Sequence, residues 1–370
     1  MVLTNTLKYI ILLSMVKILC FTRYDWSGPS SRYRFYQFFP FFEKENIEIT
    51  VCPLFNNKYV ENLFSEERRW KLFNPIVAHF KRTEKLIFHQ NCDLVWMEKE
   101  ALPWIPAFFE TALYKKSLPY VIDYDDAVFH RYDQHSNPLI RGSLSKKIDK
   151  IMARSKVVVA GNQYIADYAQ KAVAPRVEVL PTVVDLSNYK VKETFNSLPF
   201  TIGWIGSPIT SRYISIAGEA LNNFCQQEDV EFRAMGALWR DLDEIPGKLI
   251  SWNAETETEE LTRFDVGIMP LPDTPWERGK CGFKLIQYMA SGIPVIASPV
   301  GINSEIVDHG LNGYLAASTE EWIEYLKMLK ENPDLCRKMG AAGRQKVERD
   351  YSLQETAPRL VELLKEAAEV

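Results

Sequence analysis

Short runs of β-branched and other apolar residues alternate along this chain with longer helical patterns. Near-continuous apolar runs separated by helices are typical of parallel strands that are covered on both faces. Six such runs fall in each half of the chain, which predicts an α/β protein with two doubly wound domains. The expected strands are residues 16–22, 47–52, 93–97, 120–125, 156–161, 177–182, 200–206, 231–236, 248–252, 265–271, 294–299 and 313–317.

Length and composition agree with two domains. The chain has 370 residues, of which 46% are hydrophobic and 25% charged, as in globular proteins. A polar stretch that ends in Pro199 predicts a linker between the domains. We expect an N-terminal extension at 1–14, a first domain at 15–190, a linker at 191–199, a second domain at 200–351 and a C-terminal helix at 352–370 that packs back toward the first domain.

Charge is distributed unevenly between the two halves. Residues 1–190 hold 26 basic and 20 acidic side chains, a net charge of +6, whereas the remainder holds 18 and 28, a net charge of −10. The basic half is expected to meet an anionic partner, either an acceptor or the anionic surface of a membrane. The chain contains no nucleic-acid-binding motif, so nucleic acid is not an expected partner.

Cysteines, histidines and the N-terminal apolar run bear on compartment and cofactors. The six cysteines lack CxxC spacing and the five histidines lack a metal-ligand pairing, which predicts reduced thiols and no metal site. Lys17 interrupts the apolar run near the N-terminus and leaves it too short to span a bilayer. Met1 and Met15 are both candidate start residues. We expect a cytoplasmic protein, with peripheral contact at the inner face of the membrane as a further option.

Residues 58–88 form a predicted helical stretch in which basic and aromatic side chains interleave. One interpretation is a basic, aromatic surface that lies on anionic lipid. The other is a helix pair whose aromatic residues face the core and whose charges are solvated, and this one is favoured because aromatic residues at helical spacing usually face a core. The residues concerned are Arg68, Arg69, Trp70, Lys71, Phe73, Ile76, Phe80, Lys81, Arg82 and Lys85.

Segment 276–305 carries the most informative local pattern. Glycines open and close a predicted helix, and a second bend leads into another helix start at 304–305. Two helix N-termini, which attract anions, would then lie near the carboxyl end of one strand with Lys280 and Lys284 beside them, a pattern that predicts a phosphate pocket. An ordinary joint of an α/β domain is the alternative. The bends are Gly279–Gly282 and Pro299–Asn303, and the first helix is expected to end at Gly292.

Several motifs, in their order and spacing, resemble those of GT-B glycosyltransferases of the retaining family-4 group. They are GPSSRYR (28–34), LPTVVDLSNY (180–189), GWIGSPITSRY (203–213), DVGIMPL (265–271) and YMASGIPVIASPVGINSEIVDHGLNGYL (288–315). The resemblance implies two Rossmann-like domains that face a central cleft. It also implies transfer of a sugar, with retention and without a metal or other cofactor, from a nucleotide-sugar on the second domain to a glycan or lipid-linked acceptor on the first. The expected setting is synthesis of cell-surface polysaccharide or glycoconjugate.

In the second domain, the resemblance implies that three segments bind the donor. The backbone N–H groups of the second bend would contact the diphosphate, and Glu305 would face the donor sugar or cap its helix. The family usually has an Arg and a Lys after the first strand, where this chain has Ser207 and Arg212, so Lys280 and Lys284 would restore the lost positive charge. The donor-site residues are Gly206, Ser207, Arg212, Lys280, Lys284, Gln287, Gly301, Ile302, Asn303 and Glu305.

Two glutamates that are usual in the family are absent, because their positions hold Gly279 and Gln287. Gln287 can still hydrogen-bond the ribose hydroxyls, although without charge. Glu277 either reaches toward the donor sugar or is a solvated loop carboxylate. The missing glutamates favour, as an alternative, a non-catalytic nucleotide-sugar-binding subunit. A GT-B nucleotide-sugar epimerase is a further alternative, but it lacks a recognisable acid–base motif here.

In the first domain, Asp125 and Asp126 stand where the family often has a His–Asp pair. A carboxylate near the anomeric carbon could stabilise an oxocarbenium-like centre or accept the proton of the acceptor, so these two are the predicted catalytic residues. Capping of the next segment is the alternative. Gly28 is expected to let the backbone approach a sugar or phosphate. Arg32 and Arg34 would bind an acceptor phosphate, or else are charges on a helix surface.

Overall fold

The computed structural model contains every strand predicted from the sequence, each within a few residues of its expected bounds. The structure describes residues 15–57, 73–88, 91–108, 110–111, 118–195, 198–227, 229–242 and 245–369. The predicted extension at 1–14 and the first part of the predicted helical stretch, 58–72, lie outside these ranges. The chain divides into unit 1, which comprises residues 1–182 and 356–370, and unit 2, residues 183–355.

Unit 1 is built on a six-stranded parallel sheet with the order β2-β1-β3-β4-β5-β6. Every residue of β3, β4 and β5 is buried, which is why these strands read as continuous apolar runs. The strands are β1 Val16–Phe21, β2 Ile47–Val51, β3 Leu94–Glu98, β4 Tyr120–Tyr124, β5 Val157–Ala160 and β6 Val177–Val179. The helices are α2 Pro29–Arg34, η1 Tyr36–Phe38, α3 Phe39–Lys44, α5 Phe73–Phe88, α7 His130–Asp133, α8 Pro138–Leu144, α9 Lys147–Met152 and α10 Gln163–Lys171.

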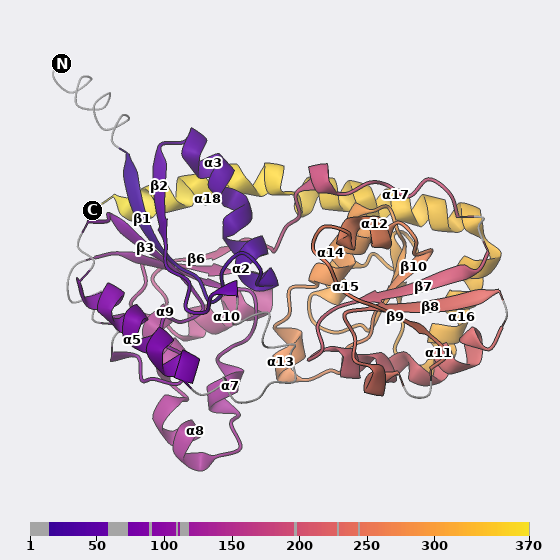
Figure 1. The fold of residues 1–370 in the computed structure, drawn as a ribbon, viewed down its shortest axis with the longest axis horizontal. Helices are drawn as coiled ribbons and strands as arrows, with labels where there is room; N and C mark the ends of the chain where they lie inside the picture. Colours follow the sequence, from indigo (N-terminus) through magenta and orange to yellow (C-terminus); the bar gives the residue numbers. More distant parts are fainter. Residues whose placement is uncertain are drawn as a thin grey trace. The chain divides into compact units, whose positions relative to one another are not determined.

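Unit 2 contains a second six-stranded parallel sheet with the order β12-β11-β10-β7-β8-β9. Its strands are β7 Phe200–Ile205, β8 Val230–Met235, β9 Lys248–Ile250, β10 Val266–Met269, β11 Val295–Ala297 and β12 Gly313–Leu315. Its helices are η3 Leu186–Asn188, η4 Ser211–Ala217, α11 Gly218–Cys225, η5 Trp239–Asp241, α12 Glu257–Leu261, α13 Pro275–Arg278, α14 Phe283–Ala290, α15 Asn303–Ile306, α16 Thr319–Glu331 and α17 Pro333–Asp350. The last helix, α18 Leu353–Ala368, begins in unit 2 and continues in unit 1 (Figure 1, yellow).

Each sheet has one point at which the strand order reverses direction, and ligands of such sheets bind outside the carboxyl ends of the strands at this switch point. In unit 1 the switch point lies between β1 and β3, and in unit 2 it lies between β7 and β10. The two Rossmann-like, doubly wound sheets confirm the predicted fold class. They also indicate where the functional side chains of each unit should be sought.

The predicted bends in segment 276–305 are confirmed. Gly282, with a φ of +62°, precedes α14, and Gly292 follows the end of that helix. The second bend leads into α15, which begins at Asn303, one residue before the expected start. Phe195, in the predicted linker 191–199, is buried in the core of unit 2.

Across the ranges that the structure describes, no helix combines enough length and apolar character to cross a membrane.

Candidate active site

A buried lysine, Lys99, organises an acidic cluster at the switch point of unit 1. It directly follows β3, and its Nζ lies 2.7 Å from Asp125 Oδ1 and 3.1 Å from Asp126 Oδ2. Burial by itself would lower the pKa of Lys99, but the two carboxylates outweigh that effect and raise it, so the ammonium stays charged. The two predicted catalytic aspartates are therefore brought together on a cation that the sequence-based prediction missed.

Two serines at the start of α2 connect this cluster to β3. Ser30 Oγ lies 2.8 Å from Asp125 Oδ2 and 2.7 Å from Glu98 Oε1, and it accepts a hydrogen bond of 3.2 Å from Lys99. Ser31 donates to the other Glu98 oxygen at 2.6 Å. The Asp125 side chain is 14% exposed and that of Asp126 is 31% exposed. Asp126 is thus the carboxylate of the pair that a ligand can approach more readily.

The backbone at Lys99 adopts a left-handed conformation, with a φ of +60°. The Glu100 N–H donates to the Glu98 carbonyl, which closes a tight turn around Lys99. The Glu100 carboxylate is buried and accepts hydrogen bonds from Lys147 Nζ at 2.7 Å and from the Tyr132 hydroxyl. A left-handed φ at a non-glycine residue is costly and persists where the surroundings hold it, as they do here.

The two arginines predicted to bind an acceptor phosphate are both buried, so the alternative of helix-surface charge is wrong. The Arg34 guanidinium makes a two-pronged ion pair with Asp123, with Nε–Oδ1 at 2.8 Å and Nη2–Oδ2 at 2.9 Å, and it also donates to the Leu180 carbonyl. Burial raises the pKa of Asp123 to about 6 despite this pair. Arg32 lies over the Tyr33 ring, 4.7 Å from its centroid. Arg34 is therefore a structural residue, and acceptor binding by Arg32 stays a prediction.

Gly28 serves the packing of unit 1 rather than the approach of a ligand. A Cβ at this position would lie 2.3 Å from the Cβ of Tyr24. The Gly28 N–H donates to the Asp25 carbonyl, and the Gly28 carbonyl accepts from Arg32. The expected reason for the glycine is thus wrong, because Tyr24 fills the space that a ligand was expected to use.

At the switch point of unit 2, Gly206 and Lys284 lie side by side, although they are far apart in the sequence. A Cβ at Gly206 would lie 2.8 Å from Lys284 Cε. The Lys284 ammonium lies 5.2 Å from the centroid of the Trp204 ring, within range of a cation–π contact. This places the lysine of α14 beside the loop that follows β7. Lys280 is half-buried, and Ser207 hydrogen-bonds the hydroxyl of Thr210.

The bend before α15 has a conformation that requires glycine. Gly301 has a φ of +53°, and a Cβ there would lie 2.7 Å from the Arg278 carbonyl oxygen. Ile302 is buried, whereas Glu305 is exposed. The Asn303 N–H donates to the Val300 carbonyl at 3.2 Å. That group is therefore already used inside the turn, and the prediction that it contacts the diphosphate is wrong for Asn303.

The amide and carboxylate near the positions of the missing glutamates are both buried. Gln287 Nε2 donates to the Tyr189 hydroxyl and to Glu257 Oε1, each at 3.2 Å. Glu277 accepts hydrogen bonds from the Tyr213 and Thr274 hydroxyls. The interpretation of Glu277 as a solvated loop carboxylate is thus wrong. Glu257, a buried carboxylate beside Gln287, was not selected from the sequence, since the two residues lie on different helices.

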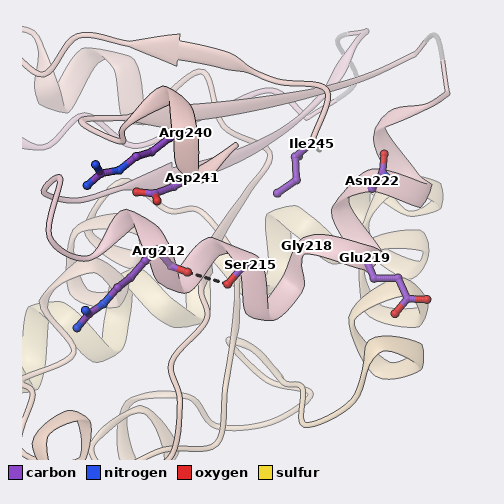
Figure 2. A pocket seen from close by; sticks show the side chains of 8 residues that line it. All are labelled: Arg212, Ser215, Gly218, Glu219, Asn222, Arg240, Asp241 and Ile245. Carbon is purple, nitrogen blue, oxygen red and sulfur yellow. Dashed lines mark hydrogen bonds between the residues drawn. The ribbon is translucent and has the colours of Figure 1, made fainter. Parts of the chain in front are cut away.

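A pocket of about 580 Å³ lies between the segments that follow β7 and β8 (Figure 2). Arg212, a predicted phosphate-binding residue, lines it. Figure 2 shows Arg212, Arg240 and Asp241 at one end of the pocket and Asn222 and Glu219 at the other. The remaining lining residues are Ser215, Gly218 and Ile245.

One segment of the chain matches a known sequence family. Residues 260–346 match the sequence family described as glycosyl transferases group 1. This segment contains α14, α15 and both of the bends described above. A comparison with curated proteins found no match.

Solved structures with the same fold cover nearly the whole chain. A sucrose-phosphate synthase from Thermosynechococcus elongatus has a TM-score of 0.70 at 13% identity, over 95% of this chain and 98% of its own. HepE from Anabaena, in complex with UDP, has a TM-score of 0.66 at 16% identity, over 95% and 100%. A glycosyltransferase from Rickettsia africae has a TM-score of 0.67 at 14% identity, over 96% and 99%. At such identities the likeness shows the fold, which is that of GT-B glycosyltransferases. On that fold the chain carries a segment of the glycosyl transferases group 1 family, residues 260–346, which indicates a transferase.

Proposed function

We propose that this enzyme transfers a sugar from a nucleotide-sugar to a glycan or lipid-linked acceptor, with retention and without a metal ion. The observation that carries the proposal is that each unit has a polar site at its switch point and that the two sites differ in chemistry. Unit 1 presents carboxylates held by a buried lysine, which suits a hydroxyl acceptor. Unit 2 presents glycine bends and a lysine, which suits a diphosphate.

In unit 2, Lys284 and the loop at Gly206 would bind the diphosphate. A departing nucleoside diphosphate gains negative charge in the transition state, and positive groups that are already in place lower the barrier. The backbone N–H groups of Gly301 and Ile302, at the bend before α15, would contribute in the same way. HepE, which shares the fold, was solved in complex with UDP and with UDP-glucose, so we propose a uridine nucleotide as the donor to test first.

In unit 1, Asp126 would accept the proton of the acceptor hydroxyl or stabilise positive charge at the anomeric carbon. Lys99 pairs with Asp126 and Asp125 and fixes their orientation through contacts at 3.1 Å and 2.7 Å. Because Lys99 acts through these carboxylates, its proposed part is that of a positioning residue. Synthesis of cell-surface polysaccharide or glycoconjugate on the cytoplasmic side of a membrane is the proposed setting.

A panel of nucleoside diphosphates and nucleotide-sugars, tested by thermal shift, would identify the donor. A ligand that binds the native state raises the melting temperature by mass action, so the correct donor should give the largest shift. Slow hydrolysis of that nucleotide-sugar by the purified enzyme, unaffected by EDTA, should follow, and NMR of the transfer product should show a retained anomeric configuration. Binding without hydrolysis or transfer would contradict the proposal and favour a non-catalytic nucleotide-sugar-binding subunit.

A further inference from the structure

Helix α5 of unit 1 is attached to its unit by one face. Arg82 and Leu86 point inward and are 3% and 5% exposed. Arg82 Nη2 donates to the carbonyls of Thr22 and Cys52, both at 2.7 Å, at the ends of the neighbouring strands β1 and β2. The helix is thus fixed to the sheet, and its other face has a defined direction.

That other face is apolar and exposed. Ile76, Phe80 and Phe88 are 70%, 74% and 72% exposed, and Val77 and Ile87 are also exposed. At 100° per residue, these five side chains fall within an arc of about 120°. The favoured prediction that the aromatic residues of this stretch face a core is therefore wrong for Phe80. We call these five residues the α5 apolar face.

Two lysines border the α5 apolar face. Lys81 and Lys85 are exposed and follow one another along the edge of the arc next to Val77 and Phe88. An apolar face flanked by lysines matches a helix that lies in the interface of an anionic bilayer, where apolar side chains enter the acyl boundary and lysines reach the headgroups. The net charge of +6 over residues 1–190 adds attraction to such a surface.

Glu84 helps to distinguish a bilayer from a protein partner. It is exposed and lies within the arc of the α5 apolar face. In the dry centre of a protein interface its carboxylate would lose its hydration, which is costly without a paired cation. On a bilayer the carboxylate keeps its water only if the helix lies shallowly, at the level of the headgroups, so Glu84 limits how deeply the α5 apolar face can enter. His79 of α5 contacts the segment after β3 through the Pro103 carbonyl at 3.0 Å. That segment exposes Trp104 and Phe108, and both residue types are common on helices and loops that lie in membrane interfaces.

We propose that the α5 apolar face, with Lys81 and Lys85, docks unit 1 on the surface of an anionic lipid bilayer. The biological use of this docking rests on the proposed function, since it would bring the enzyme to a lipid-linked acceptor. The docking itself depends only on the composition of the face and can be tested without any substrate.

Flotation of the full chain with vesicles tests the proposal. The chain should bind vesicles of phosphatidylcholine mixed with phosphatidylglycerol, and it should bind phosphatidylcholine alone at least about tenfold more weakly. Phe80→Ser with Phe88→Ser should weaken binding to the mixed vesicles by at least about tenfold. Lys81→Gln with Lys85→Gln should abolish the preference for the anionic lipid. Leu311→Ser, a change of an exposed apolar residue in unit 2, is the matched control and should leave binding unchanged.

Two results would overturn the docking proposal. One is a failure of the unmodified chain to bind the mixed vesicles. The other is self-association in light scattering that the two Phe substitutions abolish, because the face would then be an interface between copies of the chain. The thermal shift with nucleotides, measured without vesicles, should be the same for all these variants. That measurement reports on the proposed function separately, so either proposal can fail while the other stands.

Discussion

The switch points of the two units are built from different chemical groups. In unit 1, Lys99, Asp125 and Glu98 are largely buried ionisable side chains; Lys99 pairs with Asp125, and the Ser30 hydroxyl lies between Asp125 and Glu98. In unit 2, the corresponding place is formed mainly by backbone, with glycines at Gly206 and Gly301 and a lysine stacked on Trp204. A carboxylate that must meet an acceptor has to be held in place by partners. A site for a diphosphate needs donors and space, and side chains would fill that space.

The largest expected effect concerns the acidic site of unit 1. Asp126→Asn should lower the transfer rate by about 100- to 10,000-fold, the range for loss of a general base. Nucleotide binding should not change, because that site belongs to unit 2. Initial rates with a saturating donor, together with the thermal shift given by the nucleoside diphosphate, measure the two quantities separately.

Asp167→Asn is the matched control for this change. Asp167 is an exposed carboxylate on α10, where it accepts a hydrogen bond from Gln163. It should leave the rate within about twofold, in line with the small effect of surface substitutions. Equal rates for the Asp126 and Asp167 variants would remove Asp126 from the mechanism and, with it, the contrast between the two units.

The two sites also differ in how far the sequence predicted them. The proposed donor site lies mostly within residues 276–305, so its glycine bends and Lys284 could be recognised as one local pattern. The acidic site joins Ser30, at the start of α2, to Lys99 and Asp126, which follow β3 and β4, and only the fold brings them together. The strand prediction ended at residue 97, so the charged residues directly after it were not considered.

Side-chain pairs between residues that are distant in the sequence could not be predicted for the same reason. The motif at 28–34 suggested ligand binding by Arg34, but nothing in the linear pattern indicates that its partner is Asp123, on β4. Likewise, no local signal connects Gln287 to Glu257. The strands themselves were predictable because burial on both faces leaves a continuous apolar run in the sequence. Side-chain partners leave no comparable trace.

The next largest effect tests whether the buried charges of unit 1 depend on one another. Arg34→Met should lower the free energy of unfolding of unit 1 by about 3–5 kcal/mol, because it leaves Asp123 buried without its partner. Without the guanidinium, the folded-state pKa of Asp123 rises further above its present value of about 6, so the loss should be greater above that pH than below it. Urea denaturation at one pH below the Asp123 pKa of about 6 and at one pH above it measures this difference in the loss of stability.

Two further variants make that test specific. Arg337→Met removes a half-exposed arginine that pairs with Asp334 on α17, and it should cost no more than about 1 kcal/mol. Adding Asp123→Asn to Arg34→Met should recover part of the lost stability, since no unpaired charge then remains. A loss for Arg34→Met no larger than that for Arg337→Met would contradict the view that this pair supports the acidic site.

A smaller effect is expected where backbone forms the site of unit 2. Gly310→Ala changes a glycine with a φ of +80° and open space around it, so it should cost only the conformational penalty of about 1–2 kcal/mol. Gly301→Ala carries the same penalty. It also introduces a clash with the Arg278 carbonyl, which should cost a further ~1–3 kcal/mol. Thermal denaturation of the two variants isolates the clash, and equal melting temperatures would show that the bend at Gly301 can open without cost.

The smallest expected effect, and the one that bears most directly on the missing family residues, concerns Lys284. If this lysine supplies the charge that Ser207 lacks, Lys284→Ala should weaken nucleoside diphosphate binding by about 10- to 100-fold, the worth of a charge-assisted contact. The control should be a lysine without strong contacts of its own. Lys330 is unsuitable, because it pairs with Asp229 and lies over the Phe224 ring. Lys327, which is 64% exposed on α16, is the better one. Titration with the diphosphate and with the corresponding nucleoside separates the two possible causes of a loss. If Lys284 contacts the phosphate groups, only diphosphate binding should fall. A general loss of packing against Trp204 would weaken the binding of both ligands equally, and the proposed phosphate site of unit 2 would then consist of backbone groups without Lys284.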